Sequence, residues 1–251
     1  MVTHTGPSTW MGIQLSNYRN IVILTGAGVS AGSGLPTYRG TGGFWLEHNV
    51  AEYGTVEALH QSPEKVWGLF GPLRAAIRQA QPNAAHLSLA RVEGLLNADQ
   101  KFRLVTQNVD GLHQRAGSRA VVELHGDLRT SRCMDESCRF PPFADEADHA
   151  AATPQCPVCT KTLRPGIVLF GEPIPALASW TAKRALRDCD LFIAVGTSGM
   201  ASPAADMVRS AAYAGARTVL VNLEPADRDN PAYQEKYYGP AEVLLPQLLE
   251  V

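Results

Sequence analysis

The chain has no long hydrophobic run and no run of one charge, and each absence excludes a class of protein. Its longest apolar stretches, such as Leu191–Val195, have the length of a strand and are too short to cross a membrane. Lysine and arginine are not clustered and the formal net charge is −2, so a nucleic-acid or membrane partner is not favoured. The first fifteen residues hold neither an apolar signal core nor an arginine-rich amphipathic pattern, so we expect a cytoplasmic protein.

Cysteine is scarce, and its placement is informative. Four of the five cysteines form two close pairs, Cys133-x4-Cys138 and Cys156-x2-Cys159, and the fifth is Cys189. Without a signal peptide, such pairs favour a metal over disulfides, and this spacing can place four thiolates tetrahedrally around Zn²⁺. Four thiolates leave no open position for water, so we predict a structural zinc ion; the alternative is a set of buried free thiols. Cys189 is expected in the core.

The rest of the composition predicts a folded α/β protein. Apolar residues make up 45% and charged residues 18% of the 251 positions, enough to bury a substantial core. Aliphatic runs without polar alternation indicate parallel strands covered on both faces, and helical stretches separate them, so we predict a doubly wound α/β sheet. The expected strands are Ile21–Thr25, Arg103–Thr106, Val121–Leu124, Ile167–Phe170, Leu191–Val195 and Thr218–Asn222, and the expected helices Pro63–Ala80, Ala84–Leu96, Ala176–Arg187 and Ala204–Ala214.

Two regions interrupt this alternation. Residues 40–99 hold helices and loops without a convincing strand, so they are expected to form a helical module. Residues 127–165 hold the cysteine pairs and are expected to form a zinc-binding module. The nucleotide-binding sheet would then be built from residues 1–39, 100–126 and 166–251. Beyond Asp227 we expect a closing helix and a final strand.

A glycine turn follows the first predicted strand. Gly26-Ala27-Gly28-Val29-Ser30-Ala31 fits the strand, turn and helix start that bring backbone N–H groups to a pyrophosphate. A tight structural turn is the alternative. The acidic ribose ligand usual at the end of a second strand is missing, and a long irregular loop follows, so this site departs from the dehydrogenase layout.

Polar groups follow three further predicted strands, at the edge where ligands of open α/β sheets bind. Gln107, Asn108 and Asp110 present amide and carboxylate groups suited to a carboxamide and ribose hydroxyls, although a polar turn is the alternative. Gly196-Thr197-Ser198 and Asn222-Leu223-Glu224 suit phosphate and adenosine-ribose contacts.

His125 is the candidate base. It follows the strand predicted over Val121–Leu124, and an imidazole titrates near neutral pH, as proton abstraction from a ribose hydroxyl requires. For a single histidine a structural role is the alternative. His86, inside a predicted helix, is expected to pack or cap; the same context is missing for His4, His48, His60 and His149.

Taken in order, these segments resemble the sirtuin family. The match runs from about Asn20 to the C-terminus and is carried by GAGVSAGSGLPTYRG (26–40), TQNVDGLH (106–113), the HG of ELHG (125–126), the paired cysteines, RPGIVLFGE (164–172), GTS (196–198) and VNLE (221–224). The resemblance implies an NAD-binding Rossmann-like domain, a smaller domain with one structural Zn²⁺, and a substrate tunnel between them.

The resemblance also implies an activity: NAD-dependent removal of acyl groups, acetyl above all, from lysine side chains of proteins or peptides. The acyl oxygen attacks the anomeric carbon of the nicotinamide ribose and expels nicotinamide. His125 then acts as general base on a ribose hydroxyl, with Asn108 as the second catalytic residue, and free lysine and O-acyl-ADP-ribose leave.

Binding residues carry over in the same way. The backbone of Val168, Phe170, Gly171 and Glu172 would pair with an extended substrate peptide, as strand addition to an open edge. The residues implied in cofactor binding are Gly26, Ala27, Gly28, Ser30, Thr37, Tyr38, Arg39, Trp45, Gln107, Asn108, Val109, Asp110, Gly196, Thr197, Ser198, Asn222, Leu223, Glu224 and Ala241.

One departure bears on the acyl group. The commonest family loop reads P-D-F-R, whereas this chain has Thr37 and Tyr38 in its centre, as in the branch that includes desuccinylases. That branch anchors an acidic acyl group with a Tyr-x-x-Arg pair, but here Phe70 replaces the tyrosine and Arg74 stands one place later. A buried carboxylate without a cation is costly, so we expect acetyl or a longer apolar acyl group and weak desuccinylase activity.

Two other functions stay open at this level. ADP-ribosyl transfer to a protein side chain would use the same NAD site and the same base. A non-catalytic NAD-binding or zinc-scaffold protein would be favoured by loss of the base or of the amide and acid, but His125, Asn108 and Asp110 are all present.

Overall fold

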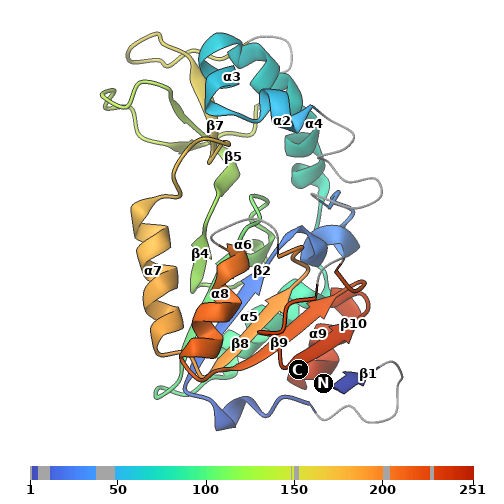
Figure 1. Cartoon of the computed structure of the whole chain (residues 1–251). Helices are drawn as coiled ribbons and strands as arrows, with labels where there is room; N and C mark the ends of the chain where they lie inside the picture. The colour runs from blue at the N-terminus through green and yellow to red at the C-terminus, as the bar shows by residue number, and fades with distance from the viewer. Residues whose placement is uncertain are drawn as a thin grey trace.

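A parallel sheet of seven strands organises the computed structural model, which describes residues 2–4, 12–37, 49–147, 149, 153–199, 204–226 and 229–251. The strand order is β1-β10-β9-β8-β2-β3-β4 (Figure 1). The predicted doubly wound sheet is thereby confirmed. The strands are β1 Val2–His4, β2 Asn20–Thr25, β3 Lys101–Thr106, β4 Val121–Glu123, β8 Leu191–Val195, β9 Arg217–Asn222 and β10 Glu235–Tyr238.

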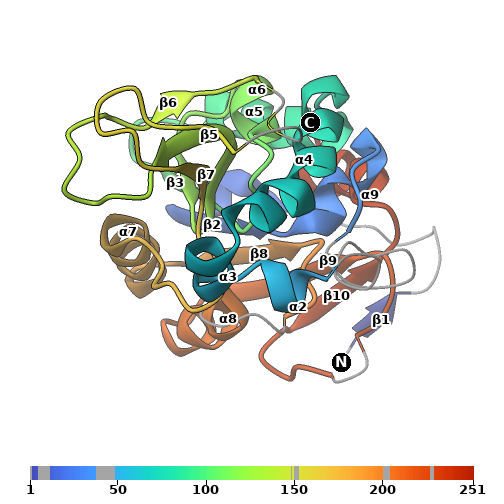
Figure 2. The ribbon, with the colours of Figure 1, turned by 90° about the horizontal axis from the view of Figure 1, so that it is seen from above.

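Both faces of this sheet are buried, which explains why its strands are apolar throughout. In β2, Ile21 and Ile23 point into one core cluster while Val22 and Leu24 point into a second. Helices α5 (Ala84–Leu95) and α9 (Ala241–Leu249) contribute to the first cluster, and α7 (Ala176–Arg187) and α8 (Ala204–Tyr213) to the second. Figure 2 shows the two helix pairs on opposite sides of the sheet. The four predicted helices match α4, α5, α7 and α8 to within a residue at each end.

The chain reverses its direction of travel across the sheet between β2 and β8. From β2 it steps outward to β3 and β4, and it later returns to β8 and continues to β9 and β10 on the other side. In register, Thr25 lies level with Thr106 on one side and Val195 on the other. The segments that follow these strands therefore meet at one edge, at the topological switch point where ligands of such sheets bind.

A small antiparallel sheet of order β6-β5-β7 stands apart from the main one. Its strands are β5 Gly126–Cys133, β6 Phe143–Ala144 and β7 Leu163–Ile167. The prediction of Ile167–Phe170 as a strand of the parallel sheet was wrong, because Ile167 ends β7 and pairs with Gly126. This run is apolar for a different reason: Ile167 and Leu169 pack into a third cluster, formed with the helical segment.

The helical segment supplies most of that third cluster. It contains the helices α2 Val50–Tyr53, α3 Val56–Gln61 and α4 Pro63–Gln79. Short elements lie outside this segment: η1 Leu15–Asn17, η2 Ala27–Ser33 and α6 Leu112–Arg115. Helix α5, expected within the helical module, instead buries Ala85, Leu89 and Val92 in the first cluster of the main sheet. The domain boundaries themselves stay a prediction.

The C-terminal tail forms both elements expected there, with strand β10 before helix α9. No helix within the described ranges is long and apolar enough to span a membrane.

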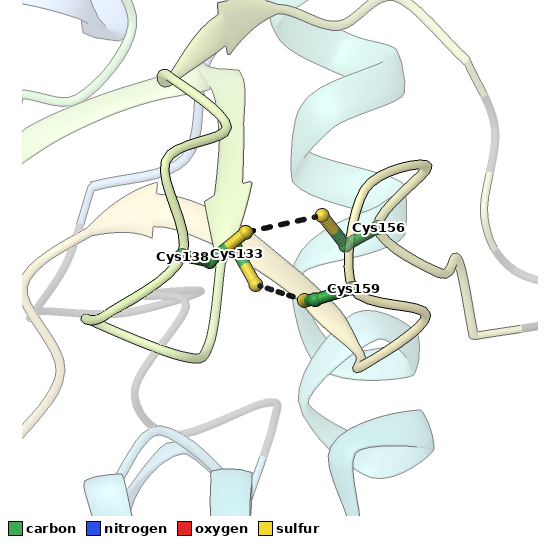
Figure 3. A group of neighbouring side chains, drawn as sticks. All are labelled: Cys133, Cys138, Cys156 and Cys159. Atoms are coloured by element: carbon green, nitrogen blue, oxygen red, sulfur yellow. Dashed lines mark hydrogen bonds between the residues drawn. The ribbon is translucent and has the colours of Figure 1, made fainter.

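The four paired cysteines converge at the far end of the small sheet (Figure 3). Their sulfur atoms lie within 4.8 Å of one another, with 3.4 Å between Cys133 and Cys159 and 3.7 Å between Cys138 and Cys156. Four sulfurs bound tetrahedrally to one zinc at about 2.3 Å would lie about 3.8 Å apart. The set therefore fits Zn²⁺, and all four thiols are free of disulfides.

Helix α4 connects the predicted zinc-binding module (residues 127–165) with the rest of the molecule. Trp67 packs against Cys133 and Cys156, and its indole N–H donates to the Leu163 carbonyl at 3.0 Å. Arg74, 4% exposed, donates to the carbonyls of Leu128 at 2.9 Å and Asp145 at 2.6 Å. Its guanidinium also lies 3.5 Å from the Asp145 carboxylate, which is itself buried.

We expect Arg74→Ala to lower the free energy of unfolding by about 3–5 kcal/mol, because it removes the cation beside the buried Asp145 carboxylate and the N–H donors to the carbonyls of Leu128 and Asp145. Arg78→Ala on the same helix is the matched control, since Arg78 is exposed and makes one 3.3 Å bond to Glu146; about 0.5 kcal/mol is expected. Denaturant unfolding of both variants measures the difference, and equal losses would contradict the role given to Arg74.

We expect the purified chain to hold one zinc ion, and Cys156→Ser to lose most of it together with thermal stability, because one of four ligands is removed. Metal content by mass spectrometry and a thermal melt with and without chelator measure both effects. Cys189→Ser is the control, because Cys189 lies outside the quartet and should leave the zinc content unchanged. Full zinc in the Cys156 variant would contradict the assignment.

Candidate functional site

The turns after β2 and β8 pack directly on each other. Gly26 N–H donates to Val195 at 3.0 Å, and Gly28 N–H donates to Gly196 at 2.9 Å. A Cβ on Gly28 would lie 2.7 Å from the Gly196 Cα, and one on Gly196, where φ is +60°, would lie 2.5 Å from the Val29 nitrogen. Glycine is thus required here by turn packing, and these two N–H groups bond within the protein. A tight structural turn, the alternative to a phosphate-binding loop, therefore accounts for part of this motif.

Ser30 lies at the centre of a buried polar cluster. Its hydroxyl donates to the Asp110 carboxylate at 2.7 Å and accepts from the Asn108 side-chain amide at 3.1 Å. The second Asp110 oxygen accepts from Leu112 N–H at 2.9 Å. Burial raises the pKa of Asp110, while these two hydrogen bonds oppose the shift. The structure therefore brings three of the predicted residues together and holds both oxygens of the acid.

His86 contacts this cluster through the Ser30 hydroxyl, which the sequence did not indicate. Its Nδ1 accepts from Asn83 N–H at 3.3 Å in a capping box that begins α5, and its Nε2 lies 3.4 Å from the Ser30 hydroxyl. Burial lowers the pKa of His86 to about 4, so the ring is neutral and donates through Nε2. The capping prediction is confirmed, and the spacing Asn83-x-x-His86 was the available signal.

His113 anchors a second buried chain of hydrogen bonds. Its Nε2 lies 2.9 Å from the Thr25 hydroxyl, which donates to Thr106 at 2.9 Å. The Thr106 hydroxyl also accepts from Asn108 N–H at 3.1 Å. Burial is the main cause that lowers the pKa of His113 to about 3, and the neighbouring His86 adds to it, so this ring is also neutral. The sequence placed His113 in a matched segment but gave it no role.

The ends of β3, β8 and β9 are linked by side-chain hydrogen bonds. Gln107 donates to the Thr197 hydroxyl at 2.9 Å, and Asn222 donates to the Thr197 carbonyl at 3.0 Å. Ser198, Leu223 and Glu224 are exposed beyond them.

The remaining predicted cofactor residues are more scattered. Ala27, Thr37 and Val109 are half-buried, and Ala241 is buried at the start of α9 in the first core cluster. Tyr38, Arg39 and Trp45 lie outside the described residues.

His125 stands between β4 and β5 in a fixed orientation. Its Nδ1 lies 3.0 Å from the Gln107 carbonyl, which can only accept, so Nδ1 carries the proton and Nε2 keeps its lone pair. Burial lowers the pKa of His125, and this hydrogen bond opposes the shift in part. Gly126 has φ +80°, and a Cβ there would lie 2.3 Å from the Gly166 carbonyl. The glycine after His125 is therefore a close-packing requirement.

The predicted substrate segment is held from two sides. Val168 N–H donates to the His125 carbonyl, and Phe170 pairs through both backbone groups with Gly54 and Val56, each bond being 2.9 Å. The edge expected to be open is thus partly used. Across the residues that the structure describes, the carbonyl of Val168 and the N–H of Gly171 have no backbone partner.

Glu172 holds the turn at the end of this segment. Its carboxylate accepts from both terminal nitrogens of Arg164, at 2.8 Å for one of them, and from Leu169 N–H at 2.8 Å. Burial acts to raise the pKa of Glu172, but the Arg164 contact, the Leu169 hydrogen bond and the charge of Arg132 together outweigh it, and the net shift is downward. The side chain therefore stays ionised, and its hydrogen bonds hold the turn after Leu169 in place.

Comparison with known proteins agrees with this geometry. The family model described as "Sir2 family" matches residues 26–203. An NAD-dependent protein deacylase of Ralstonia nicotianae is 43% identical over 91% of this chain and 90% of its own length. A protein of the same name from Escherichia coli (strain K12) is 41% identical over 92% of this chain and 81% of its own.

Solved structures show the same likeness. A Sir2 homologue bound to NAD superposes with a TM-score of 0.85 at 37% identity, covering 94% of this chain and 90% of that one. A Sir2 protein with a deacetylated peptide and 3′-O-acetyl ADP-ribose gives 0.83 at 31% identity, covering 94% of each chain. With the family model spanning more than half of the residues, the chain belongs to the Sir2 family.

Proposed function

We propose that the chain is an NAD-dependent protein-lysine deacylase. The observation that carries the proposal is the position of His125, with Nε2 unprotonated, at the sheet edge that also holds Gln107, Asn108 and Asp110. Relatives that align over nine-tenths of the chain bear that name, and related structures were solved with NAD and with a deacetylated peptide. A cytoplasmic location is part of the proposal, since free paired thiols suit a reducing compartment.

NAD would supply an electrophilic ribose carbon with nicotinamide as its leaving group. His125 Nε2 would take a proton from a ribose hydroxyl, because Nδ1 is committed to Gln107. Asn108 and Asp110, fixed through Ser30, would orient the ribose and carboxamide. The adenosine half would lie along the ends of β8 and β9, bordered by the residues predicted there: Gly196, Thr197, Ser198, Asn222, Leu223, Glu224 and Ala241. The other residues predicted to bind the cofactor are Ala27, Thr37, Tyr38, Arg39, Trp45 and Val109.

The substrate peptide would pair with the Val168 carbonyl and the Gly171 N–H, which have no backbone partner among the described residues. The Val168 carbonyl can accept and the Gly171 N–H can donate, so both can bond to the backbone of an extended peptide. Such contacts read backbone and therefore admit many sequences around the acyl-lysine.

The acyl group is proposed to be apolar. Arg74, the nearest arginine in sequence to the position expected of an acid-binding one, is buried and bonded to Leu128 and Asp145. The third cluster around Phe70 is built from aliphatic and aromatic side chains, with Leu73 packed against it. A succinyl carboxylate would be buried there without a cation, which is costly.

We expect NAD-dependent loss of acetyl and butyryl from lysine peptides, little loss of succinyl, and a fall of about 10²- to 10⁴-fold in His125→Ala, because the base is removed. Mass spectrometry of the three peptides with and without NAD measures this, with His60→Ala, exposed on α3, as the matched control. Nicotinamide release with every peptide still acylated would favour ADP-ribosyl transfer or NAD hydrolysis. Untouched NAD would leave only a binding role.

The pH profile should show an inflection below 6.5, the ordinary histidine value, because burial lowers the pKa of His125. A general base is active only when neutral, so kcat/KM should fall as the pH drops through that lowered pKa and stay level above it. Measuring kcat/KM on an acetyl-lysine peptide from about pH 5 to 8 tests this. An acid limb centred above 6.5, or one that persists in His125→Ala, would argue against His125 as the base.

A further inference from the structure

Helix α7 exposes large apolar side chains on one face. Leu177 is 74% exposed and Trp180 is 56% exposed, although both are large hydrophobic residues. The guanidinium of Arg184 lies 5.1 Å from the centre of the Trp180 ring. Spacings of three and four residues place these side chains side by side along the helix, and we call Leu177, Trp180, Lys183 and Arg184 the α7 face. The opposite side of the helix buries Ala182 and Leu186 in the second core cluster.

The α7 face carries positive charge. Helix α7 contains Lys183, Arg184 and Arg187 and no acidic residue, and Arg187 pairs with Asp188 at 3.2 Å. Lys183 and Arg184 form no ion pair within the part of the chain that the structure describes.

Acids on adjacent elements are occupied elsewhere. Asp206 on the neighbouring α8 lies 3.9 Å from Arg209, and Glu172 is bound by Arg164. Asp188, just beyond the end of α7, attracts Arg184 at longer range but pairs directly with Arg187. Lys183 and Arg184 therefore face solvent beside the exposed tryptophan without an ion pair among the described residues.

The chemistry of the α7 face selects its partner. Tryptophan and arginine are the side chains most enriched at the centres of protein interfaces, and an exposed apolar group beside cations fits an apolar residue flanked by carboxylates. A nucleic acid is a poorer match, because the face offers two cations and the chain as a whole has a net charge of −2.

The position of the α7 face connects it with the substrate segment. The loop that leaves β7 carries the chain from Val168 and Gly171 directly into the first turn of α7 (Figure 1). Leu177 lies six residues after Gly171, so the two are separated by at most about 20 Å, the length of about six extended residues. A peptide paired with Gly171 can therefore reach the α7 face with a flank of that length.

We propose that the α7 face binds an acidic flank of the protein substrate, about six to nine positions from the acyl-lysine. This inference rests on the proposed deacylase function. It gives the enzyme a sequence preference that backbone pairing at Val168 and Gly171 does not supply. The contact is distant from the reacting atoms, so it lowers KM and leaves kcat unchanged, and added salt weakens it.

The test compares three acetyl-lysine peptides: a short one that ends before α7, a long one with Glu and Leu at positions six to nine, and the same long one with Gln for Glu. We expect the acidic peptide to have a KM about three- to tenfold below that of the Gln peptide, as for a few partly exposed ion pairs. Arg184→Glu should abolish the difference, and Trp180→Ala should raise the KM of both long peptides, since both carry the leucine. Arg119→Glu, the same charge change at a side chain 80% exposed outside α7, should preserve it.

Turnover of the short peptide reports on folding, so a variant that still turns it over is correctly folded. Equal KM values for the two long peptides in the wild-type chain would overturn the proposal, as would a preference that survives Arg184→Glu. Anisotropy of the labelled long peptides measures binding without turnover. If no peptide is deacylated, the proposed function fails, and the anisotropy difference between the acidic and Gln peptides still decides whether the α7 face binds acidic segments.

Discussion

The contact between the turns after β2 and β8 is the constraint on which the site depends. Gly28 and Gly196 approach so closely that a methyl group on either would overlap backbone atoms of the other turn. This contact falls between the strands where the chain reverses its course across the sheet. It therefore fixes the relative position of the two halves of the sheet edge. Ser30, two residues after Gly28, and Thr197, directly after Gly196, are held by the same contact.

From that edge inward, burial decides the protonation of the polar groups. His86 and His113 have a low pKa and are neutral, so each can donate through one nitrogen to a hydroxyl. The Ser30 hydroxyl in turn donates to Asp110, and the Thr25 hydroxyl donates to Thr106. As a result the side chain and the backbone N–H of Asn108 are held by two separate buried chains of hydrogen bonds. A site arranged in this way needs little reorganisation when charge develops on a substrate.

The sequence predicted the local patterns well and their tertiary use less well. Unbroken aliphatic runs identified β2, β8 and β9 because both faces of the sheet are covered. The same pattern misled at Ile167–Phe170, because an apolar run cannot say which cluster buries it. The polar residues at strand ends were predictable, since carboxyl ends of parallel strands share an edge. The hydrogen bond from His86 to Ser30 was not, because it joins residues 56 positions apart that only packing brings together.

The cysteine quartet and the proposed base, His125, lie at opposite ends of the same two strands. Strand β5 begins directly after His125 and ends at Cys133, while β7 begins four residues after Cys159 and ends directly before Val168. Ligation of the cysteines by a metal ion would therefore fix the far ends of the strands that adjoin the proposed base and the predicted substrate segment. Trp67 and Arg74 brace the same two strands from α4. A zinc ion without an open coordination position can thus influence catalysis through the alignment of β5 with β7, although it touches neither substrate nor base.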